Sequence, residues 1–298
     1  MVKNKIEGMV AIQLTPFKKN GEVDEESYRR LVRYMLNNGV RAIITMGGIS
    51  ESLAMTEKQR KQVCEITVDE VKGKIPVIQG IIASYTNIAL KLAKDAEEVG
   101  ASGLMVPFIG SDEEMMYHHF NTVANAFPKI DVMLYDARHY SEIPVNVIKK
   151  LAKNCENVKY VKTQIGNTKV TRIINSLGDR IGVFCGTDTY LVPWLQLGCV
   201  GGTNSTPNVI PMHVRKIYEA ALRKDWDAVN ENWFKCWPVI YSFYGFGGGS
   251  RRTYKHALYW LGIFDNHDVL RDTGGKPSEE ALQYTRKALE DLDMKLIR

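Results

Sequence analysis

The sequence predicts an α/β protein, a closed (β/α)8 TIM barrel with additional C-terminal helices. Eight short and nearly continuously apolar segments alternate with helical patterns, which is typical of a parallel sheet covered by helices. An open, doubly wound sheet would show the same alternation, but no G-x-G-x-x-G follows the first segment and no P-loop occurs. Eight consecutive units within about 200 residues therefore favour the closed barrel.

Each predicted strand is an apolar or β-branched segment bounded by turn residues. The strands are predicted at residues 9–15, 41–46, 76–82, 103–107, 131–136, 158–163, 181–185 and 199–204. Helices are predicted between them at residues 24–38, 56–73, 86–99, 112–126, 144–153, 169–177 and 189–197. Asp24 and the acids after it mark one helix start, and Thr56 with Gln59 forms a capping box at another. Pro144 occupies a first helical turn, and Gly100 ends a helix.

Residues 1–208 are predicted to form the barrel core. Residues 209–298 are predicted to add the final barrel helix and a C-terminal helical extension within one structural unit. Large aromatic side chains gather in this extension, at Trp226, Trp233, Trp237, Tyr241 and Phe243. A last helix is predicted to begin near Pro277. We expect the extension to cap the barrel or to pack against a neighbouring subunit.

The 298-residue chain has an ordinary globular composition, with 45% hydrophobic and 24% charged residues. Its net charge of +5 is small, and without a basic patch containing aromatic residues no nucleic-acid partner is expected. The five cysteines show no C-x-x-C spacing, which argues against disulfides or a zinc cluster and fits a cytoplasmic location. No apolar run has transmembrane length, so no membrane partner is expected. His118 and His119 have no carboxylate at metal-ligand spacing, so no metal is expected.

The predicted strand at residues 158–163 contains a lysine, Lys162, within an apolar segment. Because side chains alternate along a strand, Tyr160 and Lys162 share one face and Val161 lies on the other. A buried ammonium group is costly unless it is paired or neutralised. Lys162 therefore either ends the strand and reaches solvent, or is an amine whose pKa is lowered by desolvation. Such an amine attacks a carbonyl carbon and forms a Schiff base.

Active sites of (β/α)8 barrels lie at the carboxyl ends of the strands. Besides Lys162, the sequence places there Gly47, Gly48, Ile49, Ser50, Phe108, Tyr135, Gly186, Asp188, Thr203 and Asn204. Tyr135 and Lys162 occupy corresponding positions on adjacent predicted strands. A phenol beside an amine suits imine chemistry, because it supplies a neutral proton shuttle next to the nucleophile.

Six motifs follow one another along the chain. They are V-A-I-Q-L-T-P-F at 10–17, N-G-E-V-D at 20–24, G-G-I-S-E-S at 47–52, L-Y-D at 134–136, V-K-T at 161–163 and G-T-D at 186–188. In these motifs the sequence resembles the class I, pyruvate-dependent aldolases of the dihydrodipicolinate synthase and N-acetylneuraminate lyase group. The resemblance covers nearly the whole chain, and it implies a (β/α)8 barrel with a Schiff-base lysine.

The resemblance also implies a role for each matching position. Lys162 would form the imine with the keto carbon of pyruvate or of another 2-keto acid, and Tyr135 would relay protons during carbon–carbon cleavage. The loop of Gly47, Gly48 and Ile49 would hold the substrate carboxylate. Residues that would contact the distal part of the substrate are Gly186, Asp188, Thr203, Asn204 and Ser205. No metal and no organic cofactor would be required, and the assembly would be a homotetramer.

The chain departs from the family pattern in two loops. The family loop G-T-T-G-E or G-S-T-G-E uses two hydroxyl groups to bind the carboxylate and to pass a proton to the tyrosine. Gly48 and Ile49 stand at these positions and carry no hydroxyl, so backbone N–H groups or the hydroxyl of Ser50 would have to serve. After the fourth strand, Phe108 and Ile109 replace two tyrosines of the synthase pattern, one of which completes a relay across a subunit interface. This replacement argues against a role in lysine biosynthesis.

Other positions have two interpretations each. The turn after the fifth strand carries Arg138 and His139 where the family has Asn-x-Pro, and these residues either contact an acidic or polyhydroxyl substrate or lie exposed. Glu51 is either a structural acceptor for backbone N–H groups, which is favoured, or a general base. The glycines at 247–249 lack the G-K-[ST] of a phosphate loop, so a hinge before a helix at Arg251 is expected. That helix N-terminus would bind an anionic substrate group.

We expect a lyase that cleaves a 2-keto-3-deoxy sugar acid, of the 2-keto-3-deoxygluconate type, into pyruvate and an aldehyde. Polar side chains available for the substrate hydroxyl groups are Gln164, Asp188, Thr203 and Asn204. Alternatives within the family are N-acetylneuraminate cleavage, a sugar-acid dehydratase, and a hydratase-aldolase for a less polar keto acid, which Ile49 and Phe108 would suit. An alternative from another class is a non-catalytic, keto-acid-binding barrel, which the missing loop hydroxyls would suit.

Overall fold

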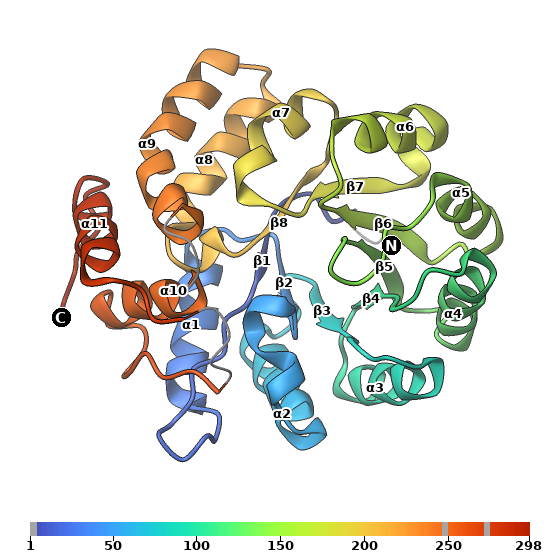
Figure 1. Ribbon diagram of the computed structural model, residues 1–298, viewed down its shortest axis with the longest axis horizontal. Coiled ribbons are helices and arrows are strands. Elements are labelled where there is room, and N and C mark those ends of the chain that lie inside the picture. The colour runs from blue at the N-terminus through green and yellow to red at the C-terminus, as the bar shows by residue number, and fades with distance from the viewer. Residues whose placement is uncertain (1–4, 246–249, 271–274) are drawn as a thin grey trace.

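The structure, a computed structural model, describes residues 5–245, 250–270 and 275–298. Eight parallel strands pair in sequence order, and the last pairs with the first, so the sheet closes into a barrel (Figure 1). The strands are β1 Gly8–Ile12, β2 Ala42–Thr45, β3 Val77–Gly80, β4 Gly103–Pro107, β5 Asp131–Asp136, β6 Val158–Thr163, β7 Gly182–Cys185 and β8 Gly201–Asn204. The predicted (β/α)8 barrel is confirmed.

Helices surround the barrel and continue beyond it (Figure 1). The barrel helices are α1 Glu25–Asn37, α2 Glu57–Val71, α3 Thr86–Val99, α4 Glu113–Ala126, α5 Val145–Asn154, α6 Asn167–Leu177, α7 Leu191–Gln196 and α8 Pro211–Leu222. The extension contributes α9 Trp226–Tyr244, α10 Ser250–Trp260 and α11 Glu279–Glu290. Short 3-10 helices are η1 Gly48–Ser50, η2 Ser52–Ala54, η3 Gly178–Arg180, η4 Asp188–Tyr190 and η5 Thr206–Asn208. Within the described ranges, no helix is long and apolar enough to cross a membrane.

The residues that cap the starts of α1 and α2 are those that the sequence predicts. The side chain of Asp24 accepts a hydrogen bond from the Ser27 backbone N–H and caps α1. Thr56 and Gln59 form the predicted capping box of α2. Pro144 is the residue before the first turn of α5, and not a member of that turn as predicted.

Some predicted strands are too long, because burial continues where strand pairing has ended. The first strand ends at Ile12, yet Gln13 and Leu14 beyond it are fully buried. The Leu14 backbone N–H donates to the side chain of Asn208 at 3.1 Å instead of to a neighbouring strand. The predicted helix at 189–197 is likewise divided between η4 and a shorter α7. The predicted hinge at 247–249 lies outside the described residues.

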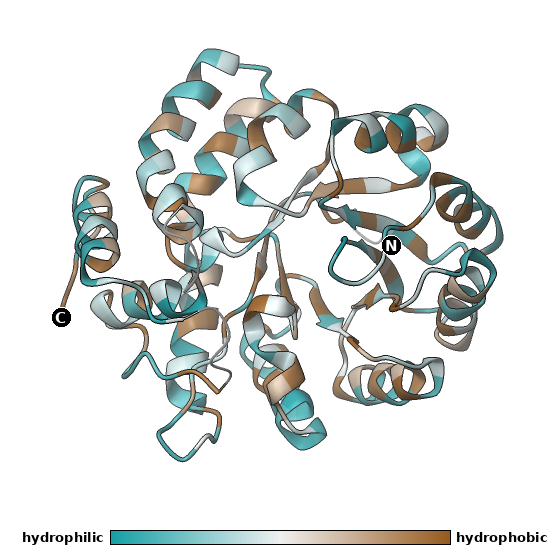
Figure 2. Cartoon of the chain, in the orientation of Figure 1, coloured by the Kyte–Doolittle hydropathy of each residue, from teal (hydrophilic) through white to brown (hydrophobic). Residues whose placement is uncertain are grey.

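Two apolar cores lie on opposite sides of the strands. The inner core is formed by Ile6, Val10, Ile12, Ala42, Ile44, Ile78, Met105, Met133, Tyr135, Ala137, Tyr160 and Phe184. The larger outer core packs the strands against the helices and includes Val161. Hydrophobic residues therefore line the barrel strands, and the helices carry both hydrophobic and hydrophilic residues (Figure 2). The predicted alternation along β6 is confirmed, because Tyr160 belongs to the inner core and Val161 to the outer one.

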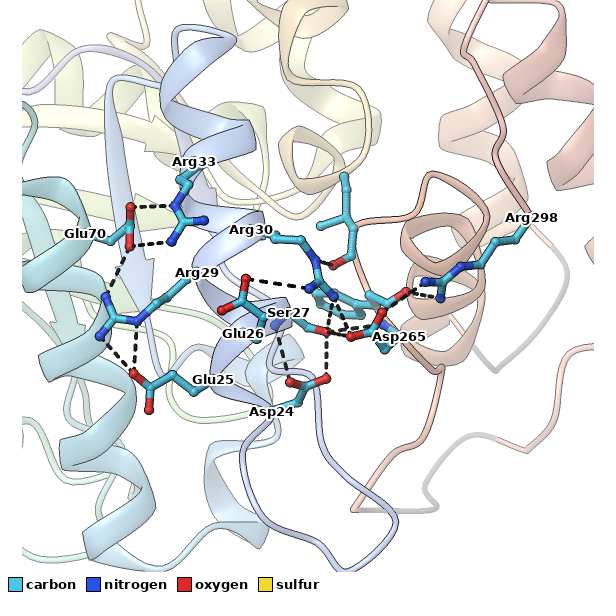
Figure 3. Close-up of polar contacts among 12 residues, drawn as sticks. Asp24, Glu25, Glu26, Ser27, Arg29, Arg30, Arg33, Glu70, Asp265 and Arg298 are labelled. Atoms are coloured by element: carbon cyan, nitrogen blue, oxygen red, sulfur yellow. Dashed lines mark hydrogen bonds and ion pairs between the residues drawn. The ribbon is translucent and has the colours of Figure 1, made fainter.

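Helix α1 joins the barrel to its C-terminal extension (Figure 3). On one side, Arg33 forms an ion pair with Glu70 of α2 at 2.7 Å. On the other side, Arg30 contacts Asp265, after α10, at 2.7 Å, and Asp265 also contacts Arg298 at 3.0 Å. The extension is thus fixed against the first barrel helix. The division of the chain at residue 208 stays a prediction.

A buried ion pair connects the ends of β5 and β6 to α6. Asp136 is fully buried, and its carboxylate accepts hydrogen bonds from the Thr163 hydroxyl at 2.6 Å and the Ile143 backbone N–H at 2.7 Å. The ammonium group of Lys169, in α6, donates to the same carboxylate at 2.8 Å. These contacts fix the strand ends on which Tyr135 and Lys162 lie.

Asp136→Ala is expected to lower the free energy of unfolding by about 3 kcal/mol, because it leaves the buried ammonium group of Lys169 largely uncompensated, with the exposed Glu142 at 3.5 Å as its remaining carboxylate in the described chain. Adding Lys169→Met should restore much of the loss, since the uncompensated charge is then removed. Denaturant unfolding of both variants measures these changes. Glu231→Ala, which breaks an exposed ion pair with Lys235, is the control and should cost about 0.5 kcal/mol. Equal losses in Asp136→Ala and the control would contradict the structural role of Asp136.

Candidate active site

A cavity of about 470 Å³ opens at the carboxyl ends of the barrel strands. Its lining residues are Ile12, Gly48, Ile49, Glu51, Ser52, Leu53, Tyr135, His139, Tyr140, Lys162, Gln164, Gly186, Thr203, Asn204, Ser205, Tyr244 and Arg251. They come from the ends of β1, β5, β6 and β8, from the loops after β2, β5 and β7, and from the extension. The structure therefore brings Lys162 and Tyr135 together with Gly48, Ile49, Gln164, Gly186, Thr203 and Asn204, as the sequence predicts.

Lys162 is buried without a charged partner. Its side chain is 1% exposed, and among the described residues it has no hydrogen-bond or ion-pair partner. Desolvation lowers the pKa of the Lys162 amine to about 7, although the nearby carboxylate of Asp188 opposes the shift. Two other described lysines are buried, but Lys169 and Lys255 each contact a carboxylate. Lys162 is thus held in the form that acts as a nucleophile near neutral pH.

Tyr135 lies directly beside this amine. It pairs with Lys162 across the β5–β6 ladder, and the Lys162 Nζ atom lies 4.0 Å from the centre of the Tyr135 ring. Burial raises the pKa of the Tyr135 phenol, which therefore keeps its proton. Its hydroxyl lies 3.3 Å from His139 Nε2. The site thus combines a neutral amine with a protonated phenol that contacts an imidazole.

Ser50 supports the loop after β2 and does not line the cavity. The Gly47 backbone N–H donates to the Ser50 hydroxyl oxygen at 3.0 Å, and that hydroxyl donates to the Gln13 carbonyl oxygen. Because these contacts use the fully buried hydroxyl, the expectation that Ser50 replaces a family hydroxyl is corrected. Gly47 also lies behind the cavity wall. A Cβ atom there would lie 2.2 Å from Ile12 Cγ2, so only glycine permits this close approach.

Helix α10 holds the same loop from the other side. Arg251 donates hydrogen bonds to the carbonyl oxygens of Gly48 at 3.1 Å and Ile49 at 3.3 Å. Lys255 donates to a carboxylate oxygen of Glu51 at 2.7 Å, and both side chains are fully buried. Desolvation lowers the pKa of Lys255 to about 8. The ion pair favours a structural role for Glu51 over a general base.

Unpaired polar atoms lie buried on β8. The Thr203 hydroxyl is buried, lies on the inner face of the strand and has no hydrogen-bond partner among the described residues. The polar atoms of the Asn204 side chain are also buried and unpaired there, but this side chain lies on the outer face, beside Gly202 and Leu191. Such groups are costly to bury unless a ligand or water satisfies them. Gln164 donates to the Gly186 carbonyl oxygen at 2.7 Å. A Cβ atom at Gly186 would lie 3.1 Å from Lys162 Cε, so this glycine leaves room for the amine.

Three predicted site residues lie elsewhere. The ring of Phe108 packs against His119 of α4 at a centroid distance of 5.5 Å, and Arg138 is exposed outside the lining. Asp188 is buried behind the wall, where it accepts a hydrogen bond from the Tyr244 hydroxyl at 2.6 Å. Tyr244 does line the cavity, and no motif could have identified it, because it ends the long helix α9 far from the barrel strands in sequence.

Comparisons with known proteins agree with this geometry. A model of the dihydrodipicolinate synthetase family matches residues 5–291. The chain belongs to this family. Members of the family are class I, pyruvate-dependent aldolases, so the protein is an enzyme of the carbon–carbon lyase type. The resemblance found in the sequence is thereby confirmed.

Similar family members share about a third of their residues with this chain. The 4-hydroxy-tetrahydrodipicolinate synthase of Chloroherpeton thalassium is 34% identical over 231 residues, which cover 76% of each chain. The synthase of the same name from Campylobacter jejuni strain 81-176 is 33% identical over 275 residues, covering 89% of this chain and 90% of the relative. A crystal structure of dihydrodipicolinate synthase from Aquifex aeolicus superimposes with a TM-score of 0.91 at 29% identity, covering 98% of this chain and 100% of the other.

Lys162→Met is expected to raise the free energy of unfolding near pH 7 by on the order of 3 kcal/mol. Burial moves the pKa of Lys162 from 10.5 to about 7, so between these values the unfolded chain binds a proton that the folded chain does not. The folded protein is therefore penalised at neutral pH, and the penalty disappears as the pH rises towards 10.5.

Denaturant unfolding at pH 7 and pH 10 measures this difference. Lys159→Met, which changes an exposed lysine of the same strand, is the matched control and should leave stability nearly unchanged. A Lys162→Met variant without added stability at pH 7 would contradict the desolvated state of the amine.

Proposed function

We propose that the protein cleaves a 2-keto-3-deoxy sugar acid, of the 2-keto-3-deoxygluconate type, into pyruvate and an aldehyde. Lys162 forms the imine and Tyr135 moves the protons. The observation that carries the proposal is the buried, unpaired amine of Lys162, which faces a cavity with the Tyr135 ring 4.0 Å away. A perturbed amine in a cavity beside a proton donor is the arrangement that Schiff-base chemistry requires.

The reaction begins when the neutral Lys162 amine attacks the keto carbon, C2. Tyr135 protonates the resulting hydroxyl, which leaves as water, and a protonated imine remains. Loss of the C4 hydroxyl proton then breaks the C3–C4 bond, and its electron pair moves towards the imine nitrogen to give an enamine and a free aldehyde. Protonation of the enamine at C3 and attack of water on the imine carbon release pyruvate and regenerate the amine.

The two ends of the cavity suit the two ends of such a substrate. The backbone of Gly48 and Ile49, with the Arg251 guanidinium beside it, forms the wall where the carboxylate would bind. On β8, the unpaired hydroxyl of Thr203 would hydrogen-bond a hydroxyl group of the sugar acid. A polyhydroxyl acid satisfies this group, whereas an apolar keto acid leaves it unpaired.

A second candidate is the synthase activity by which the relatives are named. Their identity of 33–34% favours it. Against it, Phe108 and Ile109 carry no hydroxyl, so neither supplies the phenol that the resemblance implies for that reaction. In addition, Phe108 is turned towards α4 and Ile109 is exposed. The family alternatives named from the sequence share the imine; the lyases among them differ in the aldehyde released, and the dehydratase differs in breaking a C–O bond. A non-catalytic barrel would gain nothing from burying the unpaired Lys162.

The assembly and the cellular location expected from the sequence are kept as proposals. We propose a homotetramer in the cytoplasm, with α9 as one contact surface. Phe234 and Trp237 on this helix are 69% and 37% exposed, and large exposed aromatic side chains are typical of protein–protein contacts.

Borohydride reduction in the presence of pyruvate is expected to trap a pyruvyl adduct on Lys162. Intact mass and peptide mapping identify the modified residue, and Lys162→Ala should lose both the adduct and turnover while remaining folded. Lys255 is the internal control, because it is equally buried but contacts Glu51 and does not line the cavity. An adduct on Lys255, or none in folded protein, would contradict the proposed mechanism.

Substrate choice is tested by adding 2-keto-3-deoxygluconate and measuring pyruvate release with lactate dehydrogenase. We expect release by the wild type, and Thr203→Val should lower kcat/KM by about tenfold through the lost hydrogen bond. The same variant should still trap pyruvate on Lys162, since Thr203 is assigned to the distal part of the substrate. Formation of 4-hydroxy-tetrahydrodipicolinate from pyruvate and aspartate semialdehyde in a parallel assay, without sugar-acid cleavage, would establish the second candidate instead.

A further inference from the structure

The Tyr135 hydroxyl is buried, and His139 is its hydrogen-bond partner. Tyr135 is 3% exposed, and His139 Nε2 at 3.3 Å is its one partner within the described part of the chain. Other hydroxyl groups at this end of the barrel do not take that place. Gly48 and Ile49 carry none, and that of Ser50 is bonded to the backbone of the loop after β2. Among the described residues, His139 is therefore the one that contacts the Tyr135 hydroxyl and can exchange a proton with it directly.

His139 is held in place by a closed turn. Ala137 and Ser141 form an antiparallel bridge, and the Tyr140 backbone N–H donates to the Ala137 carbonyl oxygen at 2.9 Å. The Ser141 hydroxyl oxygen accepts from the Gly110 backbone N–H at 3.0 Å, which ties the turn to the loop after β4. The turn is therefore fixed independently of the contact between His139 and Tyr135.

Two tyrosine rings, those of Tyr135 and Tyr140, fix the orientation of the His139 imidazole. The His139 ring lies 4.4 Å from that of Tyr140 and 5.8 Å from that of Tyr135, and the two tyrosine rings are 5.2 Å apart. His139 lines the cavity but is also exposed to solvent at its rim. It thus connects a buried phenol to bulk water, which is the position of a proton-exchange group.

We infer that His139 is the proton-exchange partner of Tyr135 in the imine chemistry. This inference rests on the proposed function and deepens it. His139 acts through the phenol, so it is a positioning and relay residue and does not itself protonate the substrate. It supplies at this site the proton path for which Gly48, Ile49, Phe108 and Ile109, at the replaced family positions, offer no hydroxyl.

The number of protons is conserved when the relay runs in either direction. When the carbinolamine loses water, the phenol proton moves to the departing hydroxyl and the His139 imidazolium returns a proton to the phenol oxygen. When a C3 proton is removed, it moves to the phenol oxygen as the phenol proton passes to neutral His139. The C3 electron pair then forms the enamine double bond, and the imine nitrogen becomes neutral. One proton is thus stored on His139 and returned.

The charged and titratable groups facing His139 agree with this cycle. They are Tyr135 on β5, Lys162 on β6 and Tyr140 in its own turn. Burial and the positive charge of Lys162 lower the pKa of His139, so the imidazole is neutral and ready to accept a proton when Lys162 carries the charge of the imine.

Deuterium exchange at the pyruvate methyl group, followed by proton NMR in heavy water, isolates the proton transfer without an aldehyde. His139→Gln retains a side chain that hydrogen-bonds but does not titrate, and we expect it to slow exchange by about 100-fold. His118→Gln is the matched control, because it changes an exposed histidine of α4 outside the cavity, and its exchange rate should equal that of the wild type.

Two further readouts distinguish a relay from a structural contact. At saturating pyruvate, exchange by the wild type should rise with pH through the titration of His139, whereas His139→Gln should show no such rise. Tyr135→Phe should also slow exchange by about 100-fold, and adding His139→Gln should cause little further loss, because the two residues act in series.

The outcomes separate the two hypotheses. If His139→Gln exchanges deuterium at the wild-type rate or keeps the wild-type pH profile, while the wild type still traps pyruvate on Lys162, the relay is refuted and the proposed function stands. Fully additive losses in the double variant also refute it. A wild type that neither traps pyruvate nor exchanges deuterium refutes both.

Discussion

The site depends on burying the amine of Lys162 where no carboxylate can neutralise it. The barrel makes this possible by directing the side chain inwards at the end of β6, above the apolar inner core. Gly186 adds the space beside the amine, because its missing Cβ would lie 3.1 Å from Lys162 Cε. Lys169 and Lys255 show the usual solution, in which a buried ammonium contacts a carboxylate. The absence of such a contact gives Lys162 its reactivity at a cost in stability.

The fold and the central pair were predictable because they depend on local patterns. Strand alternation places Lys162 and Tyr160 on one face, and equal positions on consecutive strands bring Tyr135 beside Lys162. Apolar periodicity and capping residues gave the order of strands and helices. The same reasoning overestimated the length of β1, because Leu14 remains buried after the strand ladder ends.

The remaining wall of the cavity could not be predicted, because distant contacts decide it. Tyr244 reaches the cavity from a helical extension whose packing no periodic pattern reveals. The Ser50 hydroxyl lies outside the cavity lining and donates to the Gln13 carbonyl oxygen, just after β1, a partner that sequence spacing cannot identify. Phe108 follows β4 as expected, yet its side chain turns outwards to His119. Sequence position gives the strand end on which a residue lies, and packing decides which way its side chain points.

The contact between Glu51 and Lys255 also bears on how the protein is made. These residues are separated by 204 positions, and Arg251 reaches the same loop across a similar separation. When all eight strands of a nascent chain have emerged from the ribosome, Lys255, the cation that neutralises Glu51, has not yet emerged. The loop after β2 would therefore take its final shape only after α10 has been synthesised and has docked. Completion of the cavity wall is thus a late event in biosynthesis, because Tyr244 and Arg251, which line it, belong to the last part of the chain.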